Sequence, residues 1–153
     1  MRWSNIDEIP CPVAQAMAVI GDAWTTLILR DALRGAKRFD DFLQGTRASR
    51  ASLSERLAHL VAHGVFEKVQ YEAHPPRYEY RLTARGEALR PVLMVMADWA
   101  ETHLPAKVYR WGRRHTACGH RFRPVLSCSE CGEAIEPNDV TYDKPPAIKR
   151  ERA

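Results

Sequence analysis

The side chains with the most distinctive chemistry lie in one short segment, HTACGHRFRPVLSCSECG at residues 115–132. Each end of this segment carries two metal-binding side chains that are separated by two residues and followed by glycine. The four candidate ligands are His115, Cys118, Cys128 and Cys131. A tight turn with this spacing directs both side chains at one ion, and two such turns supply the tetrahedral set that structural Zn²⁺ prefers. The pattern therefore predicts a structural zinc site on a small Cys/His hairpin.

Several alternatives stay open for this segment, which resembles a zinc ribbon over about residues 113–135. His120 competes with His115 as a ligand, and the spacing favours His115 only modestly. The segment could instead be a metal-free hairpin with small apolar cysteines, or Cys118 could form a disulfide with one of the other two. Size favours zinc, because so short a segment has little core and an ion would supply much of its folding energy. A catalytic zinc is disfavoured, because four protein ligands leave no open position.

The composition is that of a globular protein with one domain and a small appendage. The chain has 153 residues, of which 45% are hydrophobic and 27% charged, and its net charge is +4. Residues 1–104 hold 13 basic and 13 acidic side chains, whereas residues 105–153 hold 10 and 6. No apolar run approaches the roughly 18 residues of a bilayer span, and the N-terminus lacks a signal-peptide core. We therefore expect a cytoplasmic protein with no membrane partner.

Helical patterns occupy the first part of the chain. Apolar residues recur at helical spacing between residues 12 and 34, and Gly21 with the aspartate after it interrupts the run, which predicts two helices. A short helix is expected over residues 38–44, with the following glycine and threonine as its stop. A further helix is expected over residues 50–63, where Ser49 is a good N-cap for a one-sided leucine stripe.

Strand periodicity follows, and then a last helix. Two alternating runs flank a turn with two prolines, which predicts a β-hairpin. The side chains expected to share its faces are Val65, Val69 and Tyr71 in the first run, and Tyr78, Tyr80 and Leu82 in the second. Thr83 is expected to cap one long helix that Pro91 kinks and Pro105 closes. The predicted fold class is α+β and mainly helical.

Two of these helices, at residues 38–44 and 50–63, are close enough to form a helix-turn-helix, whose second helix can enter the major groove of DNA. The face of that helix opposite the leucines carries Arg50, and arginine can contact guanine or a phosphate. The hairpin would then be a wing, with His74 and Arg77 available for phosphates. Residues 34–56 carry a local net charge of +3, which suits nucleic acid.

Three stretches resemble the HxlR-type winged-helix transcriptional regulators, which are relatives of the MarR group. They are CPVAQAMAVIGDAWTTLILRDALRGAKRFDDF, LSERLAHLVAHGVFEK and PPRYEYRLTARGEAL, within residues 10–104. The resemblance implies a homodimer that pairs its first and last helices and binds a palindromic operator. It places Ser49, Arg50, Ala51 and Ser54 at the groove-facing start of the recognition helix, and Arg38, Arg56 and Arg77 at backbone or wing positions. Many members have Ile-Ser-Pro where this chain has Ala48-Ser49-Arg50, so the gained arginine favours phosphate or guanine contact.

The remaining cysteine, Cys11, precedes a proline at the start of a predicted helix. A helix N-terminus favours the thiolate form, and some members of the family that the chain resembles sense oxidants or electrophiles at this place. We therefore consider Cys11 a candidate sensor whose modification would shift the dimer and loosen DNA. The alternative is a partly buried apolar residue near the dimer interface.

The sequence thus predicts a homodimeric regulator that binds double-stranded DNA, with an oxidant or small-molecule effector left open. The alternative is a protein-interaction module whose Cys/His hairpin docks a partner. No Ser/His/Asp order, phosphate loop or paired carboxylates indicates an enzyme. The predicted domains are an arm at residues 1–10, the winged-helix domain at 11–104, the Cys/His extension at 105–140 and a tail at 141–153.

Overall fold

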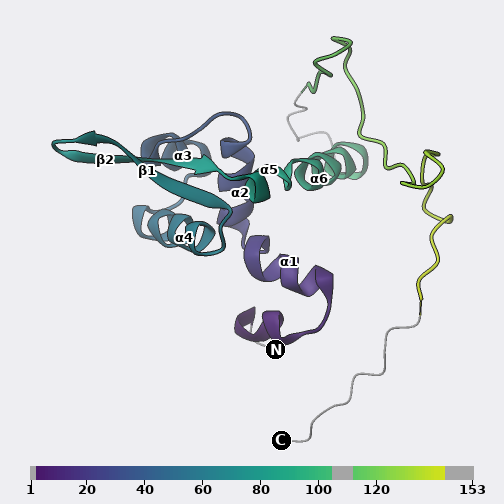
Figure 1. Ribbon diagram of the computed structural model, residues 1–153, viewed down its shortest axis with the longest axis horizontal. Coiled ribbons are helices and arrows are strands. Elements are labelled where there is room, and N and C mark those ends of the chain that lie inside the picture. The colour runs from purple at the N-terminus through teal and green to yellow at the C-terminus, as the bar shows by residue number, and fades with distance from the viewer. Residues whose placement is uncertain (1–2, 105–111, 144–153) are drawn as a thin grey trace, which may run out of the picture. The chain divides into compact units, whose positions relative to one another are not determined.

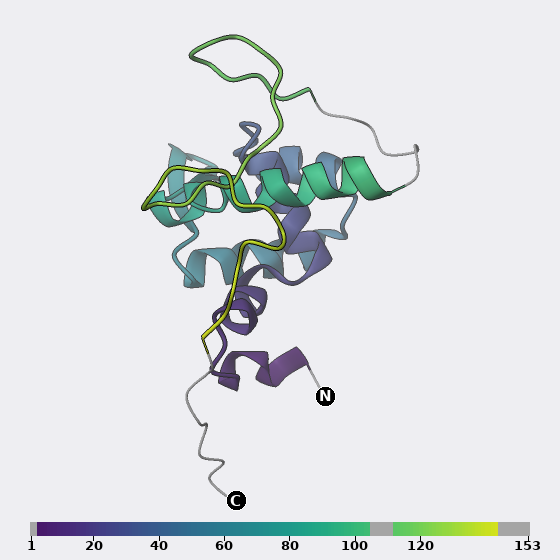
Figure 2. The same ribbon diagram turned by 90° about the vertical axis from the view of Figure 1, so that its right-hand side faces the viewer.

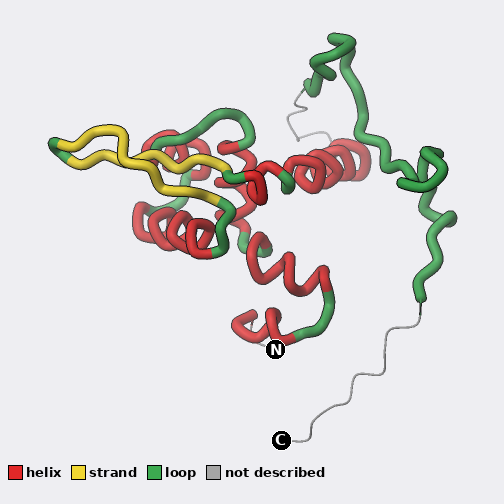
Figure 3. Tube along the Cα trace, in the orientation of Figure 1, coloured by secondary structure: helices red, strands yellow, loops and turns green. Residues whose placement is uncertain are grey.

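The computed structural model describes residues 3–104 and 112–143, in two compact units at residues 1–97 and 98–153 (Figure 1). In chain order its elements are η1 (Trp3–Glu8), α1 (Pro12–Ile20), α2 (Ala23–Ala32), α3 (Phe39–Thr46), α4 (Arg50–Ala62), β1 (Phe66–Ala73), β2 (Pro76–Leu82), α5 (Ala84–Glu87) and α6 (Arg90–His103). Most of the regular structure is helical, and the two strands form an antiparallel sheet, as Figure 3 shows. The α+β, mainly helical fold class is therefore confirmed.

The break between α1 and α2 has a local cause. Gly21 leaves no room for a β-carbon beside the carbonyl of Met17, and the Asp22 carboxylate accepts the N–H groups of Trp24 and Thr25 at 3.0 and 3.1 Å. That cap starts α2, because it satisfies amides that have no partner within the helix. Two helices form here, as predicted.

Among the described residues no single helix is long and apolar enough to cross a bilayer. Only α1 and α2 together meet that test, and they are bent by 78°.

Helix α3 runs further than the sequence predicts. Gly45 lies inside the helix, and the stop is Arg47, which adopts the left-handed conformation with φ 59°. The expectation that Gly45 ends the helix is therefore wrong. Its role is spatial, because a β-carbon at this position would collide with the Asp31 carboxylate of α2. Arg30 also donates to the Gly45 carbonyl at 2.9 Å, so the glycine lets α2 and α3 pack closely.

Helix α4 begins where the sequence predicts. The Ser49 hydroxyl accepts the Ser52 N–H at 3.1 Å, which confirms the N-cap. Its leucine stripe faces the core, where Leu53, Leu57 and Leu60 are fully buried. The other core side chains come from α1, α2, α3, the turn after α3 and the start of the hairpin: Ile20, Ile28, Leu29, Ala32, Phe42, Ala48, Val65 and Phe66. The leucine face of α4 is therefore fixed by burial, and its opposite face is left for solvent.

The hairpin forms as predicted, and one of its faces packs on the core. In the register Phe66 pairs with Leu82, and Lys68 pairs with Tyr80, so Phe66 shares a face with the two residues of β2 that pack on the core. The ring of Phe66 lies 6.4 Å from that of Tyr80. Val65, just before β1, is buried as well, whereas Tyr71 is 40% exposed and lies where the register shifts between Gln70 and Glu72.

The single long helix predicted after Thr83 is instead two helices. The Thr83 hydroxyl accepts the Gly86 N–H at 3.2 Å and caps the four-residue α5, after which the chain breaks and restarts as α6 at Arg90. Pro91 therefore lies in the first turn of α6, where its missing N–H costs nothing, and the predicted kink inside a long helix is wrong. The predicted stop at Pro105 lies outside the described residues.

Candidate nucleic-acid interface

One face of α4, at the start of the helix, lies open to solvent. Four predicted contact residues are exposed there, while the leucines on the opposite side of the helix are buried. The exposed residues are Ser49, Arg50, Ala51 and Ser54. Helix α3 lies beside α4, and a short turn at residues 47–49 joins them (Figure 1). The pair therefore has the organisation of a helix-turn-helix whose second helix presents a small, polar and basic surface.

Arg50 is an exposed arginine of this surface with two weak contacts. Its side chain is 71% exposed, its Nη2 lies 3.4 Å from Asp40 Oδ1, and its guanidinium lies 5.6 Å above the Phe39 ring. An exposed ion pair of this length contributes little stability. A phosphate or a guanine edge could therefore take the place of Asp40 at low cost.

Arg38 joins the start of α3 to the wing. Its backbone N–H donates to the Asp41 carboxylate at 3.0 Å, and it forms an isolated β-bridge with Glu79 of β2. Its exposed guanidinium lies 4.9 Å above the Tyr71 ring of β1. This contact holds a positive charge at the edge where the wing meets the helix-turn-helix.

The wing itself carries the other predicted basic contacts. His74 lies in the exposed turn between the strands, and Arg77 follows it on β2 with a side chain that is 57% exposed. The Arg77 Nε lies 3.2 Å from the Glu72 carboxylate on the facing strand. The hairpin extends past α3 and α4 in Figure 1, so its tip is free to meet a ligand that these helices also meet.

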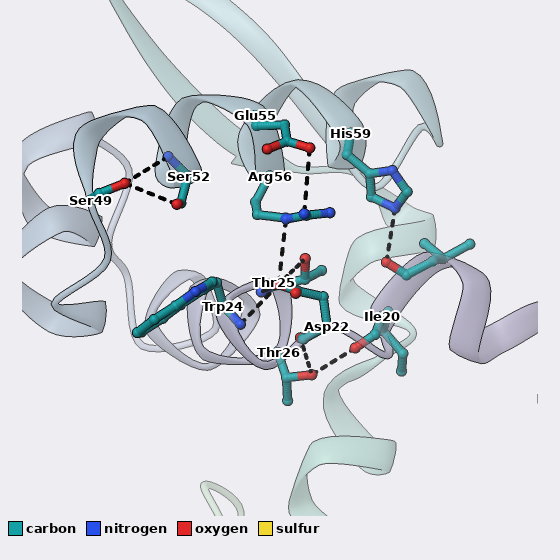
Figure 4. Close-up of polar contacts among 11 residues, drawn as sticks. Ile20, Asp22, Trp24, Thr25, Thr26, Ser49, Ser52, Glu55, Arg56 and His59 are labelled. Atoms are coloured by element: carbon teal, nitrogen blue, oxygen red, sulfur yellow. Dashed lines mark hydrogen bonds and ion pairs between the residues drawn. The ribbon is translucent and has the colours of Figure 1, made fainter. Parts of the chain in front are cut away.

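Arg56 differs from the other predicted phosphate contacts. Figure 4 shows its side chain directed at α2, where Nε lies 3.5 Å from Asp22 Oδ1, while Nη2 lies 3.4 Å from Glu55. Only 29% of the side chain is exposed. Because Asp22 is also the N-cap of α2, Arg56 joins the recognition helix to the start of α2. Sequence reasoning missed this partner, since nothing local to Arg56 indicates a residue so far along the chain.

A second bond holds α4 to the N-terminal helices. His59 Nε2 donates to the Val19 carbonyl at 3.1 Å, one turn of α4 beyond Arg56 (Figure 4). The two links fix the rotation of α4 about its axis. They thereby determine which side chains of its first turn face outward.

Helix α6 has an apolar face that the described residues leave exposed. None of its 14 residues is buried, and its exposed large side chains include Met96 at 50% and Trp99 at 58%. Val13 of α1 is likewise 70% exposed. Leu93 of α6 packs against the core, but the face with Met96 and Trp99 gains little from packing in the single chain. Cys11, the N-cap of α1, is partly exposed and its thiol makes no capping hydrogen bond.

The predicted metal ligands come together in two pairs. His115 Nδ1 lies 3.4 Å from Cys118 Sγ, and the Cys131 thiol is within hydrogen-bond reach of Cys128. Backbone N–H groups of Cys131 and Glu130, together with that thiol, lower the pKa of Cys128. In the described ranges no three His, Cys, Asp or Glu side chains lie close enough to share a metal, and all four cysteines are free thiols.

Two arginines that sequence reasoning missed anchor this segment within the second unit. Arg113 donates to Asp98 and Glu101 of α6 at 3.3 and 3.0 Å. Arg123 donates to Asp98 at 2.9 Å and to the Thr102 hydroxyl at 3.1 Å. The hydrogen bond from Arg123 holds the pKa of Asp98 below its ordinary value, and the charges of both arginines act in the same direction. The residues next to the first Cys/His pair are thereby fixed to α6.

Comparison with known proteins identifies related sequences. The chain matches the HxlR-like helix-turn-helix family over residues 19–108. An uncharacterized HTH-type transcriptional regulator of Mycobacterium tuberculosis is 37% identical over 142 residues, which cover 92% of this chain and 90% of the relative. The HTH-type transcriptional regulator YdeP of Bacillus subtilis is 33% identical over 102 residues, which cover 66% of this chain and 80% of YdeP.

Solved structures share the fold. The crystal structure of PA1607 is 30% identical, with a TM-score of 0.80, and the match covers 93% of this chain and all of that one. The redox regulator HypR in its reduced form is 31% identical, with a TM-score of 0.57 over 60% of this chain and 92% of HypR. The reduced transcriptional regulator YodB of Bacillus subtilis is 28% identical, with a TM-score of 0.54 over 65% of this chain and all of YodB.

Proposed function

This chain belongs to the HxlR-like helix-turn-helix family, and on that premise we propose that it regulates transcription as a homodimer on a palindromic site in double-stranded DNA. Its relatives bear the name of transcriptional regulators, and the family does not consist of enzymes. One observation carries the DNA contact. The first turn of α4 is exposed at every predicted contact residue while the rest of that helix is held by buried leucines and by Arg56 and His59.

The contacts divide into those that read bases and those that hold the backbone. Arg50 and Ser54 lie where the first turn of a recognition helix meets base edges, and the small Ala51 lets the helix approach closely. Arg38, His74 and Arg77 lie at the wing and its junction with α3, where they suit phosphates. Each phosphate contact makes the affinity for DNA more sensitive to salt. Per contact, log K falls by about 0.9 for each unit increase in log[salt].

The uncovered face of α6 supports the homodimer. A palindrome is read by a two-fold assembly, whose interface uses the same surface on both copies. Burial of Met96 and Trp99 against a second copy would remove the apolar surface that a single chain leaves exposed. In such a dimer the two recognition helices would lie about one DNA turn apart, ~34 Å.

Selection of bound duplexes from a random pool, at two salt concentrations, tests this function. The expected result is an enriched palindrome whose half-sites lie about 10 base pairs apart, with affinity that falls steeply in salt. The Arg50→Ala variant should lose the enrichment, whereas Arg85→Ala, an exposed arginine of α5, should retain it. Failure to enrich any duplex, together with capture of a protein through the Cys/His segment, would favour the interaction-module alternative.

We also propose that Cys11 makes DNA binding sensitive to oxidants or electrophiles. Its thiol is partly exposed at the N-terminus of α1, the helix that presents Val13 to solvent, and the structural neighbour HypR is a redox regulator. Modification of the thiol would then alter α1 at the dimer interface. Diamide should release the parent protein from its operator and leave a Cys11→Ser variant bound. Equal release of both proteins would disprove this role for Cys11.

A further inference from the structure

The two Cys/His turns, His115–Gly119 and Cys128–Gly132, repeat one backbone pattern. In each turn the N–H of the first residue donates to the carbonyl oxygen five residues later, at 2.9 Å in both cases. The N–H of the closing glycine donates back to the carbonyl of the first residue, at 2.7 Å in the first turn and 2.9 Å in the second. Both glycines have a positive φ, 71° and 77°, which glycine adopts without strain. Figure 2 draws the two turns within separate loops.

This repeat decides which side chains are equivalent. The pairs are His115 with Cys128, Cys118 with Cys131, and His120 with Glu133. The isolated β-bridges that flank the turns keep the same offset: Arg114 with Arg121, and Ser127 with Ala134. Cysteine, a frequent metal ligand, therefore occupies the position of His115, whereas glutamate occupies that of His120. The backbone thus favours His115 over His120 and adds to the modest preference that the spacing gives.

The first turn already has the geometry of a metal-binding pair. Zinc bonds of about 2.3 Å to sulfur and about 2.0 Å to nitrogen, at a tetrahedral angle, place the two ligand atoms about 3.5 Å apart. His115 Nδ1 and Cys118 Sγ are separated by 3.4 Å. Both side chains are exposed, so burial in an apolar core does not explain the contact.

We propose that one Zn²⁺ ion joins the two turns, with His115 Nδ1 and the sulfurs of Cys118, Cys128 and Cys131 as its four ligands. Each turn supplies two ligands, so neither can fill a tetrahedral site alone. The eight residues that separate the turns span at most about 26 Å, so the second turn would have to move toward the first for both to reach one ion. Binding replaces the protons of the three thiols by the ion, and His115 binds in its neutral form.

Zinc would supply what this region does not obtain from packing. No described side chain of residues 112–143 is buried. In so small a unit the free energy of metal binding contributes directly to the stability of the fold. Arg113 and Arg123, which flank the first turn, hold it to Asp98 of α6. The ion would therefore fix the second turn with respect to a helix as well as to the first turn.

Titration of the chelator-treated, reduced full-length protein with Co²⁺ alone, in the absence of DNA, tests this site independently of the proposed function. We expect one ion per chain, tetrahedral d–d absorption with thiolate-to-cobalt charge transfer, and full displacement by one equivalent of Zn²⁺. His115→Ala and Cys131→Ser should each weaken binding by at least about 100-fold. His115→Cys should retain it, because it keeps a ligand at the same position.

His120→Ala and Cys11→Ser are the matched controls, and both should bind Co²⁺ within twofold of the parent. Circular dichroism of every variant should show unchanged helix content, because the helices lie outside the turns. Loss of binding in His120→Ala with retention in His115→Ala would overturn the ligand assignment. One ion per two chains, or no cobalt bound by the reduced protein, would overturn the site itself.

Discussion

The winged-helix unit and the Cys/His segment are held in shape by different means. In the first unit, residues 1–97, the side chains of Ile28, Phe42 and Leu57 are fully excluded from solvent. In residues 112–143 no described side chain is buried, and Val125 is 71% exposed. Its contacts include two hydrogen-bonded turns, two β-bridges and the arginine ion pairs to α6.

This difference shows where each part obtains its stability. Burial contributes about 25 cal/mol per Å² of apolar surface, which is enough to stabilise a helical domain of this kind. A segment with no buried side chain lacks that source, and a few ion pairs to one helix are a small substitute for a core. A bound ion would compensate, so zinc removal should loosen the Cys/His segment and leave the winged helix folded.

The largest effect is expected in the core. Phe42 is fully buried, and its ring lies 6.0 Å from Phe66 and 6.4 Å from Tyr80. Phe42→Ala should lower the free energy of unfolding by about 3–5 kcal/mol, through lost burial and the cavity it leaves. Val125→Ala should change it by less than about 0.5 kcal/mol. Denaturant titrations followed by circular dichroism measure both, and comparable losses would contradict the contrast between the two regions.

The next effect concerns α6. Met96→Glu places a carboxylate on the exposed apolar face, and the two-fold symmetry of a homodimer would bring a second carboxylate to the same interface. The variant should therefore raise the dimer dissociation constant by at least about 100-fold. Gln44→Glu, an exposed position on α3, adds the same charge elsewhere and should leave the dimer intact. Sedimentation velocity over a range of concentrations measures this. A Met96→Glu dimer as stable as the parent would place the interface on another surface.

DNA contacts should give smaller, separable effects. Arg50→Ala should weaken binding to the selected operator by about 10-fold to 100-fold and relax its sequence preference. Arg77→Ala should weaken binding to all duplexes and reduce the salt slope by about 0.9.

Arg56→Ala should leave the salt slope unchanged, because its side chain faces Asp22. A reduced slope for Arg56→Ala would show that it contacts phosphate after all.

The smallest effect is expected at Asp98. Because Arg123 lowers its pKa in the folded state, its contribution to stability is present above its ordinary pKa of about 3.9 and is lost as the pH falls through the lower, folded-state value. Asp98→Asn should therefore raise hydrogen exchange in residues 112–123 about twofold to fivefold at pH 7. Variant and parent should converge below the folded-state pKa. A difference that persists in acid would show that the carboxylate charge is not the cause.

The sequence by itself determined the features that depend on neighbouring residues. The cap at Ser49 and the leucine stripe after it could be read directly, because a cap and a helical face involve residues within a few positions. The hairpin and the two spaced ligand pairs are local in the same way. The exposed residues of the recognition helix followed from the stripe, since they lie on its other side.

Only the tertiary structure decided which distant residues meet. The partner of Arg56 is Asp22, Gly45 makes space for Asp31, and Phe66 rather than Tyr71 joins the core. Each depends on how two elements pack, and packing is set by volume and charge over the whole domain rather than by local propensity. The equivalence of the two Cys/His turns is of the same kind, because it rests on backbone hydrogen bonds that the spacing of the residues does not give.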